Sequence, residues 1–267
     1  MHRIQLEVTN DEYCDDAWRW WADRAGGWNS GVEGRPARWD EDRAAVVAGM
    51  VSAFEEAERD AVYRAIGARR DVRRGFTGEP LAEDVLERIL GAAHRAPSVG
   101  LMQPSRFILI RSQEVRARVK EAFEAANRKA LEGYDGEDRE RYRALKLEGI
   151  LEAPQNLCVV CDAESERGRG LGRQTMPETA IYSTVCAIQN LWLAARAEGV
   201  GVGWVSIVSP NALRSILGIP GHVVPVAYLC LGYVDRFGEE PELERLGWER
   251  RCSLESVLFH ETYGGGA

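Results

Sequence analysis

The residues best suited to chemistry lie in the stretch AIGARRDVRRGF, residues 65–76. Four arginines crowd around a single carboxylate, that of Asp71: Arg69, Arg70, Arg73 and Arg74. Guanidinium groups match phosphate oxygens through charge-assisted hydrogen bonds, so the cluster is typical of a phosphate site. Arginines that end a helix in solvent, where they meet the negative end of the helix dipole, are the alternative. That alternative leaves Asp71 unexplained.

The chain that carries this cluster is acidic overall, with 267 residues and a formal net charge of −8. A negative field does not favour nonspecific binding to nucleic acid, and no nucleic-acid partner is expected. No run of about 18 apolar residues predicts a transmembrane helix, and we expect no membrane partner. The start, MHRIQLEVTNDEYCDD, lacks the basic and apolar parts of a signal peptide, so a cytoplasmic protein is expected.

The cysteines and histidines predict no metal site. Six cysteines are scattered along the chain, and only Cys158 and Cys161 have the C-x-x-C spacing. Their flanks are apolar and favour a buried strand, on which residues three apart point to opposite faces. This geometry suits neither a metal nor a redox pair, and H-E-x-x-H is absent.

Composition divides the chain into two parts. Residues 1–50 mix five tryptophans with Gly, Pro and charges and show no clean period, which indicates an N-terminal Trp-rich extension. Residues 51–267 show regular patterns and form one predicted domain. The expected helices begin at a Ser52-x-x-Glu55 capping box and run to about Arg69, then cover 81–96, a segment opened by Ser112, 177–199, 209–218 and a short turn at 253–259. The expected strands cover 106–110, 156–162, 202–208 and 223–234.

This interspersed order predicts a single α/β or α+β domain. The helix over 177–199 is apolar nearly all round, so we expect it in the centre or in a subunit interface. The charged segment 127–150 is interpreted either as a lid or as a solvated surface helix. The familiar nucleotide loops are missing, because G-x-x-x-x-G-K-[ST] is absent and GVGVG, residues 199–203, follows a helix instead of a strand.

Together with the arginines, the stretch AAHRAPSVGLMQPSRFILI, residues 92–110, resembles the nitroreductase-like flavoprotein family. The segment AIQNLWLAARAEGVGVGW resembles the family's central helix and the glycine turn near the flavin ring, and Arg251 to Glu255 resembles its last phosphate contact. The resemblance implies an α+β fold with a central, mostly antiparallel sheet surrounded by helices. It also implies a homodimer that binds FMN at its interface.

Within the family, the chain resembles most closely the branch that makes 5,6-dimethylbenzimidazole, the lower ligand of vitamin B12. The motifs that carry this resemblance are RRDVR, APSVGLMQP, LKLEGI, PETAIYSTVCAIQNLWLAARAEGVGVGWVSI and VAYLCLGYVDRFGEEPELERLGW. Ordinary nitroreductases usually carry Ser or Thr at Asp71 and Asn at Leu101. The branch uses reduced FMN and O2 as substrates and releases dimethylbenzimidazole and erythrose 4-phosphate without a metal. A separate flavin reductase is then the expected source of reduced FMN. The chain departs from the branch at Ser105, where tryptophan is common, and in its Trp-rich extension.

The resemblance implies two catalytic residues. Asp71 would move protons, and Ser206 would position oxygen or a ring nitrogen; a strand-end hydroxyl bonded to backbone is the plainer interpretation of Ser206. Predicted FMN-binding residues are Arg69, Arg70, Asp71, Val72, Arg73, Ser98, Gly203, Val205, Ser206 and Arg251. We expect His94 to pack on a helix and Gln103 to orient its loop.

Two other functions stay open at this point. One is an NAD(P)H-dependent nitroreductase or flavin reductase, which would keep its flavin through many turnovers. The other is a non-catalytic flavin-binding protein, with the Trp-rich extension contacting a partner.

Overall fold

A computed structural model of the chain describes residues 53–265. The predicted extension 1–50 and Ser52 of the expected capping box lie outside the described residues. Within them, four strands form one antiparallel sheet in the order β1-β2-β4-β3. The strands are β1 (Ser105–Ile110), β2 (Gln155–Asp162), β3 (Val200–Val205) and β4 (Val223–Tyr233). The predicted α+β fold with a central antiparallel sheet is confirmed.

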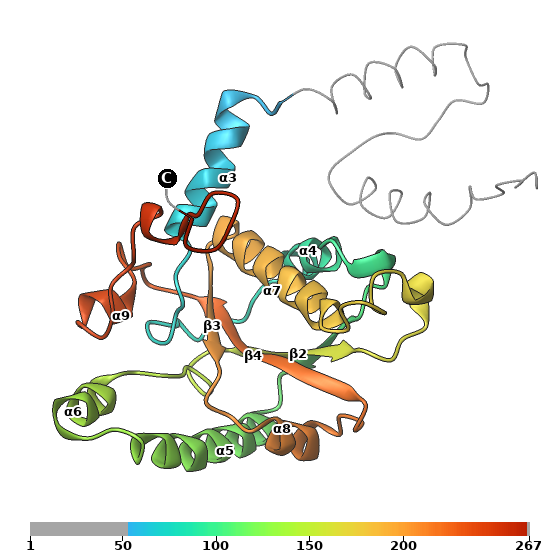
Figure 1. Cartoon of the computed structure of the whole chain (residues 1–267). Coiled ribbons are helices and arrows are strands. Elements are labelled where there is room, and N and C mark those ends of the chain that lie inside the picture. The colour runs from blue at the N-terminus through green and yellow to red at the C-terminus, as the bar shows by residue number, and fades with distance from the viewer. Residues whose placement is uncertain (1–52, 266–267) are drawn as a thin grey trace, which may run out of the picture. The chain divides into compact units, whose positions relative to one another are not determined.

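Helices cover both faces of this sheet (Figure 1). The helices are α3 (Glu56–Ala68), α4 (Glu83–His94), α5 (Gln113–Leu131), α6 (Gly136–Ala144), α7 (Thr179–Ala197), α8 (Pro210–Leu217) and α9 (Glu242–Arg245). Short 3-10 turns cover Val99–Leu101, Arg167–Gly170 and Glu255–Val257. One core cluster joins α4 and α7 to one face of the sheet, and another joins α5 and α8 to the other face. The site therefore rests on a three-layer frame.

Strand β2 is the buried centre of the frame, as its apolar sequence predicts. Cys158 packs in the cluster under α5 and α8, whereas Cys161 packs with Met102 and Ala180 on the face that α7 covers. The two thiols thus point to opposite faces, as expected. Burial raises the pKa of Cys158 to about 12 and also raises the pKa of Cys161, so both behave as core residues.

Helix α7 begins two residues after Pro177 and ends just before Gly199, close to the predicted limits. Its buried side packs on β2, β3, β4 and α4, which makes it the central helix of its layer. On its other side Tyr182 and Val185 are exposed. Within the described residues, the helix is therefore central and also carries an apolar outer face.

Strand β3 is shifted from its predicted position. It spans Val200–Val205 instead of 202–208, because Gly199 turns the chain with a φ of 74° and Val200 already pairs with Tyr233. Ser206 therefore lies immediately after the strand and is exposed.

Candidate functional site

The arginine-rich segment leaves the end of α3 and runs along the edge strand β3. Asp71 forms a parallel bridge with Val202, and the Val72 N–H donates to the Val202 carbonyl at 2.9 Å. Val72 is buried there. These contacts fix the backbone of the segment to the sheet, so the side chains of Arg69, Asp71 and Arg73 project from a supported backbone.

Gly203 is what permits this close approach. A Cβ atom at Gly203 would lie 2.0 Å from the Val72 carbonyl oxygen, and one at Gly201 would lie 2.6 Å from a methyl group of Val234. Backbone cannot move aside as the end of a flexible side chain can. The glycine-rich turn after α7 is therefore a packing requirement of the site.

Asp71 is held by two donors. The Trp204 backbone N–H donates to its Oδ1 at 2.9 Å, and the Arg73 guanidinium donates to its Oδ2. The Asp71 side chain keeps 27% of its surface exposed, while Arg73 keeps 14%. The carboxylate is thus oriented by the protein and still open on one side, as a proton-transfer group must be.

The arginines and Asp71 line a hollow of about 170 Å³. Its lining residues are Arg69, Arg70, Asp71, Arg73, Pro241, Glu242, Leu243 and Arg251. Binding sites for ligands of drug size usually enclose about 300–1,000 Å³. The hollow in one copy of the chain is therefore large enough for only part of a flavin nucleotide.

The arginines of the cluster have different partners. Arg70 donates to the carbonyls of Gly67 and Arg69, each at 2.7 Å, and to that of Glu239. Arg74 pairs with Glu242 at 2.9 Å. These two guanidinium groups already have acceptors, and they tie the end of α3 to the loop before α9.

Arg69 and Arg251 differ from the others, because within residues 53–265 neither guanidinium group has a hydrogen-bond acceptor or a carboxylate in ion-pair distance. Burial lowers the pKa of Arg69; Asp71 acts in the opposite direction, and the charges of Arg251 and Arg70 lower it further. The positive charges of Arg69 and Arg251 repel each other in one hollow, and a bound anion would reduce this repulsion.

Two residues that line this hollow, Arg70 and Arg73, carry further donors that fit an anionic ligand. The Nε atoms of Arg70 and Arg73 are buried, and they have no hydrogen-bond partner in the part of the chain that the structure describes. A buried donor without an acceptor is costly. The phosphate and hydroxyl oxygens of FMN would supply the missing acceptors, so the residues present fit that molecule.

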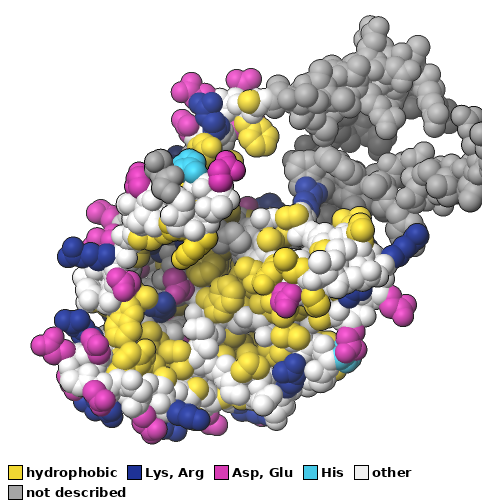
Figure 2. All heavy atoms as spheres, viewed as in Figure 1, with side chains coloured by type: hydrophobic (Ala, Val, Ile, Leu, Met, Phe, Trp, Pro, Cys, Tyr) yellow, Lys and Arg dark blue, Asp and Glu magenta, His cyan; other side chains and the backbone are white. Residues whose placement is uncertain are grey.

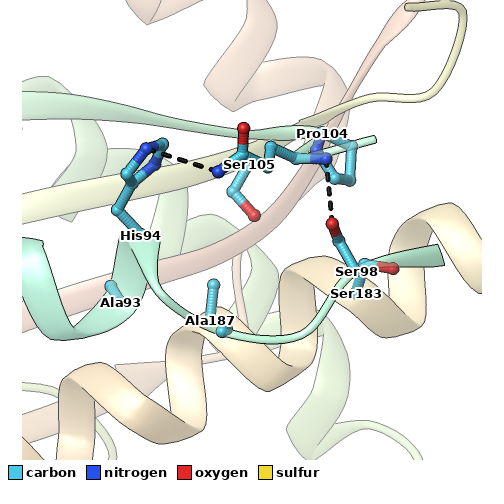
Figure 3. A pocket seen from close by; sticks show the side chains of 9 residues that line it. Ala93, His94, Ser98, Pro104, Ser105, Ser183 and Ala187 are labelled. Atoms are coloured by element: carbon cyan, nitrogen blue, oxygen red, sulfur yellow. Dashed lines mark hydrogen bonds between the residues drawn. The ribbon is translucent and has the colours of Figure 1, made fainter. Parts of the chain in front are cut away.

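Ser98 lies in a second, smaller hollow that shares no lining residue with the arginine hollow. Figure 3 shows Ser98 next to Ser183 of α7, with His94 on the opposite side of the hollow and Ala187 below. The Ser98 hydroxyl accepts the Gln103 N–H at 3.0 Å. One copy of the chain therefore does not bring Ser98 to the arginine hollow.

Gln103 is a link between neighbouring segments. Its side chain accepts from Arg167 at 2.9 Å and lies 3.5 Å from Nε2 of His94. Its backbone has a φ of 47°, in the left-handed region. These contacts agree with the expectation that Gln103 orients the loop. His94, in contrast to the expectation that it packs on a helix, is exposed at the end of α4.

Val205 is the last residue of β3 and is buried, whereas Ser206 after it is exposed. Within the described chain the Ser206 hydroxyl makes no hydrogen bond, which differs from the plainer interpretation of a hydroxyl bonded to backbone. Gly203 and Val205 lie on β3 on either side of Trp204, whose N–H donates to Asp71, and Ser206 follows the strand. The strand therefore brings Gly203 and Trp204 beside the carboxylate, with Val205 and Ser206 next along the chain.

Sequence reasoning missed several residues of the site. Pro241, Glu242 and Leu243 line the arginine hollow, and Trp204 contributes the backbone N–H that holds Asp71. The sequence carried a signal for the first three, because GEEPELERLGW was among the stretches that resemble the family branch. It carried no signal for a backbone N–H, whose role depends only on position.

Across residues 53–265, no group of three or more His, Cys, Asp or Glu side chains is placed to hold a metal ion. Over the same residues, no helix combines the length and the apolar character needed to cross a membrane.

Residues 66–233 match the model of the family described as the nitroreductase family. The chain belongs to the nitroreductase family. The match includes Asp71 and the whole sheet, so the family's fold is what places the arginine segment against β3.

Two relatives in the family bear a more specific name. The chain is 44% identical over 198 residues to a 5,6-dimethylbenzimidazole synthase of Rhodospirillum rubrum, covering 74% of this chain and 93% of the relative. It is 42% identical over 202 residues to a 5,6-dimethylbenzimidazole synthase of Rhodobacter capsulatus, covering 76% and 97%.

Solved structures of the family share the fold. A structure of oxidized iodotyrosine deiodinase bound to FMN and 3-iodo-L-tyrosine is 20% identical, with a TM-score of 0.61 over 76% of this chain and all of that one. The NADPH:FMN oxidoreductase of Vibrio harveyi, complexed with NAD+, is 18% identical, with a TM-score of 0.55 over 76% and 78%. At these identities the likeness extends to the fold alone.

Proposed function

We propose that this chain is an enzyme with 5,6-dimethylbenzimidazole synthase activity, which fragments reduced FMN in the presence of O2 to dimethylbenzimidazole and erythrose 4-phosphate. Identity of 42–44% to synthases, over about three quarters of this chain and nearly all of each relative, carries the proposal. FMN is the substrate, and its reduced ring supplies the electrons for the reaction with oxygen. The protein's own residues bind, orient and move protons.

The phosphate of FMN is assigned to the arginine hollow. Arg69 and Arg251 supply guanidinium groups that have no other acceptor in the described chain. The Nε atoms of Arg70 and Arg73 also lack an acceptor there, and oxygen atoms of FMN would provide one. Arg74, paired with Glu242, stays outside the proposed contact. Charge-assisted hydrogen bonds of this kind are about twice as strong as neutral ones.

Asp71 is assigned the proton transfers. The Trp204 N–H and Arg73 fix the direction of its carboxylate, and one side of it remains open to the hollow. Val72 and Gly203 allow this carboxylate to lie against the strand. A group that is oriented before the ligand binds can transfer a proton without reorganisation.

Ser206 and the backbone from Gly203 to Val205 are assigned to the ring side of FMN. The support is the position of Gly203 and Trp204 beside Asp71, and the Ser206 hydroxyl just after β3, which makes no hydrogen bond within the described residues. This hydroxyl would position oxygen or a ring nitrogen. Ser98 is assigned to the ring side as well, contributed by the second copy of a homodimer.

A homodimer is supported by exposed apolar surface. No residue of α3 is buried, and Val62, Tyr63 and Ile66 of that helix are exposed, as are Tyr182 and Val185 of α7. Figure 2 shows apolar side chains over much of one face. A face of this kind on a monomer would be costly, so a second copy is the proposed cover. It would also enlarge the 170 Å³ hollow.

The charged segment 127–150, which includes the end of α5 and all of α6, is proposed as a lid. Tyr134 and Tyr142 stack at 4.8 Å, and Trp248 lies edge-on to both, at 5.6 and 6.2 Å between ring centroids. This contact joins the segment to the chain that leads to Arg251. A cover that excludes water is what oxygen-dependent chemistry on a reduced flavin needs.

A separate flavin reductase remains the proposed source of reduced FMN, in the cytoplasm.

One experiment tests the function against its alternatives. The purified full chain is supplied with chemically reduced FMN and then exposed to air, and flavin and products are followed by chromatography. Loss of FMN with dimethylbenzimidazole appearing is the expected result. Sustained oxidation of NAD(P)H with FMN conserved would instead identify a reductase, and binding with no turnover of any kind would identify a flavin-binding protein.

A further inference from the structure

The end of α3 is held by side chains of α7. Helix α3 has no buried residue and packs against α7. The Trp192 indole N–H donates to the Arg70 carbonyl at 3.2 Å, and the Arg196 Nε–H donates to the Ala68 carbonyl at 3.1 Å. The last carbonyls of a helix lack partners within the helix, so Arg196 completes the end of α3 at Ala68, and Trp192 holds the chain two residues beyond it.

The Trp192 ring also carries a charged group of the site. The Arg69 guanidinium carbon lies 4.9 Å from the centre of that ring. The same ring lies 6.2 Å from that of Trp204, whose backbone N–H holds Asp71. Trp192 itself is only 9% exposed. A single buried side chain therefore contacts the backbone of the arginine cluster, its unpaired guanidinium and the residue that orients the carboxylate.

We propose that Trp192 is a positioning residue for the phosphate site, holding Arg69 in the hollow as a charged group before the ligand arrives. This inference rests on the proposed function, since it takes Arg69 as a phosphate contact. An aromatic face attracts a guanidinium group and replaces part of the water that burial removes from it, and tryptophan does this best. The indole N–H fixes the neighbouring carbonyl, so the backbone and the side chain of the cluster are oriented together.

A double-mutant cycle on FMN binding tests this role. The dissociation constant of oxidised FMN is measured by quenching of flavin fluorescence for the full chain and for Trp192→Leu, Arg69→Ala and the double variant. Trp192→Leu should weaken binding by about tenfold, a factor that corresponds to about 1.4 kcal/mol. In the Arg69→Ala background the same change should weaken it by less than about twofold, because the group it positions is gone.

Two further measurements separate positioning from simple packing. Riboflavin lacks the phosphate, so its affinity should change by less than about twofold in Trp192→Leu. The matched control is Leu191→Ala, which removes a fully buried side chain from the next position of α7. It should lower the melting temperature and leave the affinity for FMN unchanged.

The outcomes distinguish this inference from the proposal beneath it. If Arg69→Ala binds FMN as tightly as the parent, the phosphate assignment itself is wrong. A second outcome is that Arg69→Ala weakens FMN binding, but Trp192→Leu weakens it by the same factor with and without Arg69. A third is that Leu191→Ala weakens FMN binding as much as Trp192→Leu does. Either result would make Trp192 a core residue only. Should Trp192→Leu fail to fold, Trp192→Phe replaces it in the cycle. Trp192→Phe should weaken FMN binding by about threefold, and this effect should disappear in the Arg69→Ala background. If the effect persists there, the inference is wrong.

Discussion

Replacing Asp71 by asparagine should separate binding from chemistry. The amide oxygen can still accept the Trp204 N–H at 2.9 Å, so the side chain keeps its place on β3. The change removes the titratable group and the ion pair with Arg73. It therefore tests the proton-transfer role without emptying the site.

The structure sets the size of each effect. Arg73 and Asp71 are 14% and 27% exposed, between a surface pair and a buried one, so losing the pair should cost about 1–3 kcal/mol of the free energy of unfolding. FMN affinity should stay the same or rise slightly, because Arg73 no longer pairs with a carboxylate that competes with the oxygen atoms of FMN. Dimethylbenzimidazole formation should fall at least ~100-fold, the lower end of what one general acid–base group contributes.

The assay compares Asp71→Asn with a control, Glu198→Gln. The control is also a carboxylate-to-amide change that breaks an ion pair with an arginine, because Glu198 pairs with Arg88 at 2.8 Å. Glu198 does not line the arginine hollow. Both variants receive reduced FMN in air, and oxygen uptake, intact FMN and dimethylbenzimidazole are measured. Asp71→Asn should consume oxygen and return intact FMN, while Glu198→Gln should form product normally. Near-normal product yield from a folded Asp71→Asn protein would refute the catalytic role and leave Asp71 as a structural ion pair.

Three further predictions concern the arginines, the close backbone contact and the core thiols. Arg69→Ala should raise the dissociation constant of FMN, measured by flavin fluorescence, by about 10- to 150-fold, equivalent to about 1.5–3 kcal/mol. Arg251→Ala, at an exposed position, should raise it by less. Unchanged FMN affinity in both variants would contradict the phosphate assignment. Gly203→Ala, whose Cβ would lie 2.0 Å from a backbone oxygen, should destabilise the fold by about 3 kcal/mol in urea unfolding, whereas Gly91→Ala, with nothing within 4 Å, should not destabilise it. Burial raises the pKa of Cys158 to about 12 from the ordinary 9.0, so the unfolded thiol ionises first and the free energy of unfolding should fall by about 1 kcal/mol between pH 8 and pH 10. That fall should be smaller in Cys158→Ala, and an unchanged pH dependence would contradict it.

The sequence by itself determined the order of elements and the chemistry of the cluster. Apolar runs such as 156–162 predicted strands, and the 3.6-residue period predicted the helices, because both patterns are local consequences of which face is buried. The charge of four arginines around Asp71 is equally local. The family resemblance added the fold and the FMN expectation, and the family match confirms the fold.

Only the tertiary structure decided which of those charges are available. Arg70 and Arg74 find partners at Glu239 and Glu242, about 170 residues further along the chain, and no periodicity in the sequence encodes such contacts. The need for glycine at 203 arises because residues 71 and 72 lie against that strand. Trp192 reads in the sequence as one apolar residue of a helix, and becomes the support of Arg69 only because α7 packs under the end of α3. Local sequence patterns determine whether a segment forms a helix or a strand. Which segments lie side by side depends on how the layers pack, and the site is made from residues that this packing brings together.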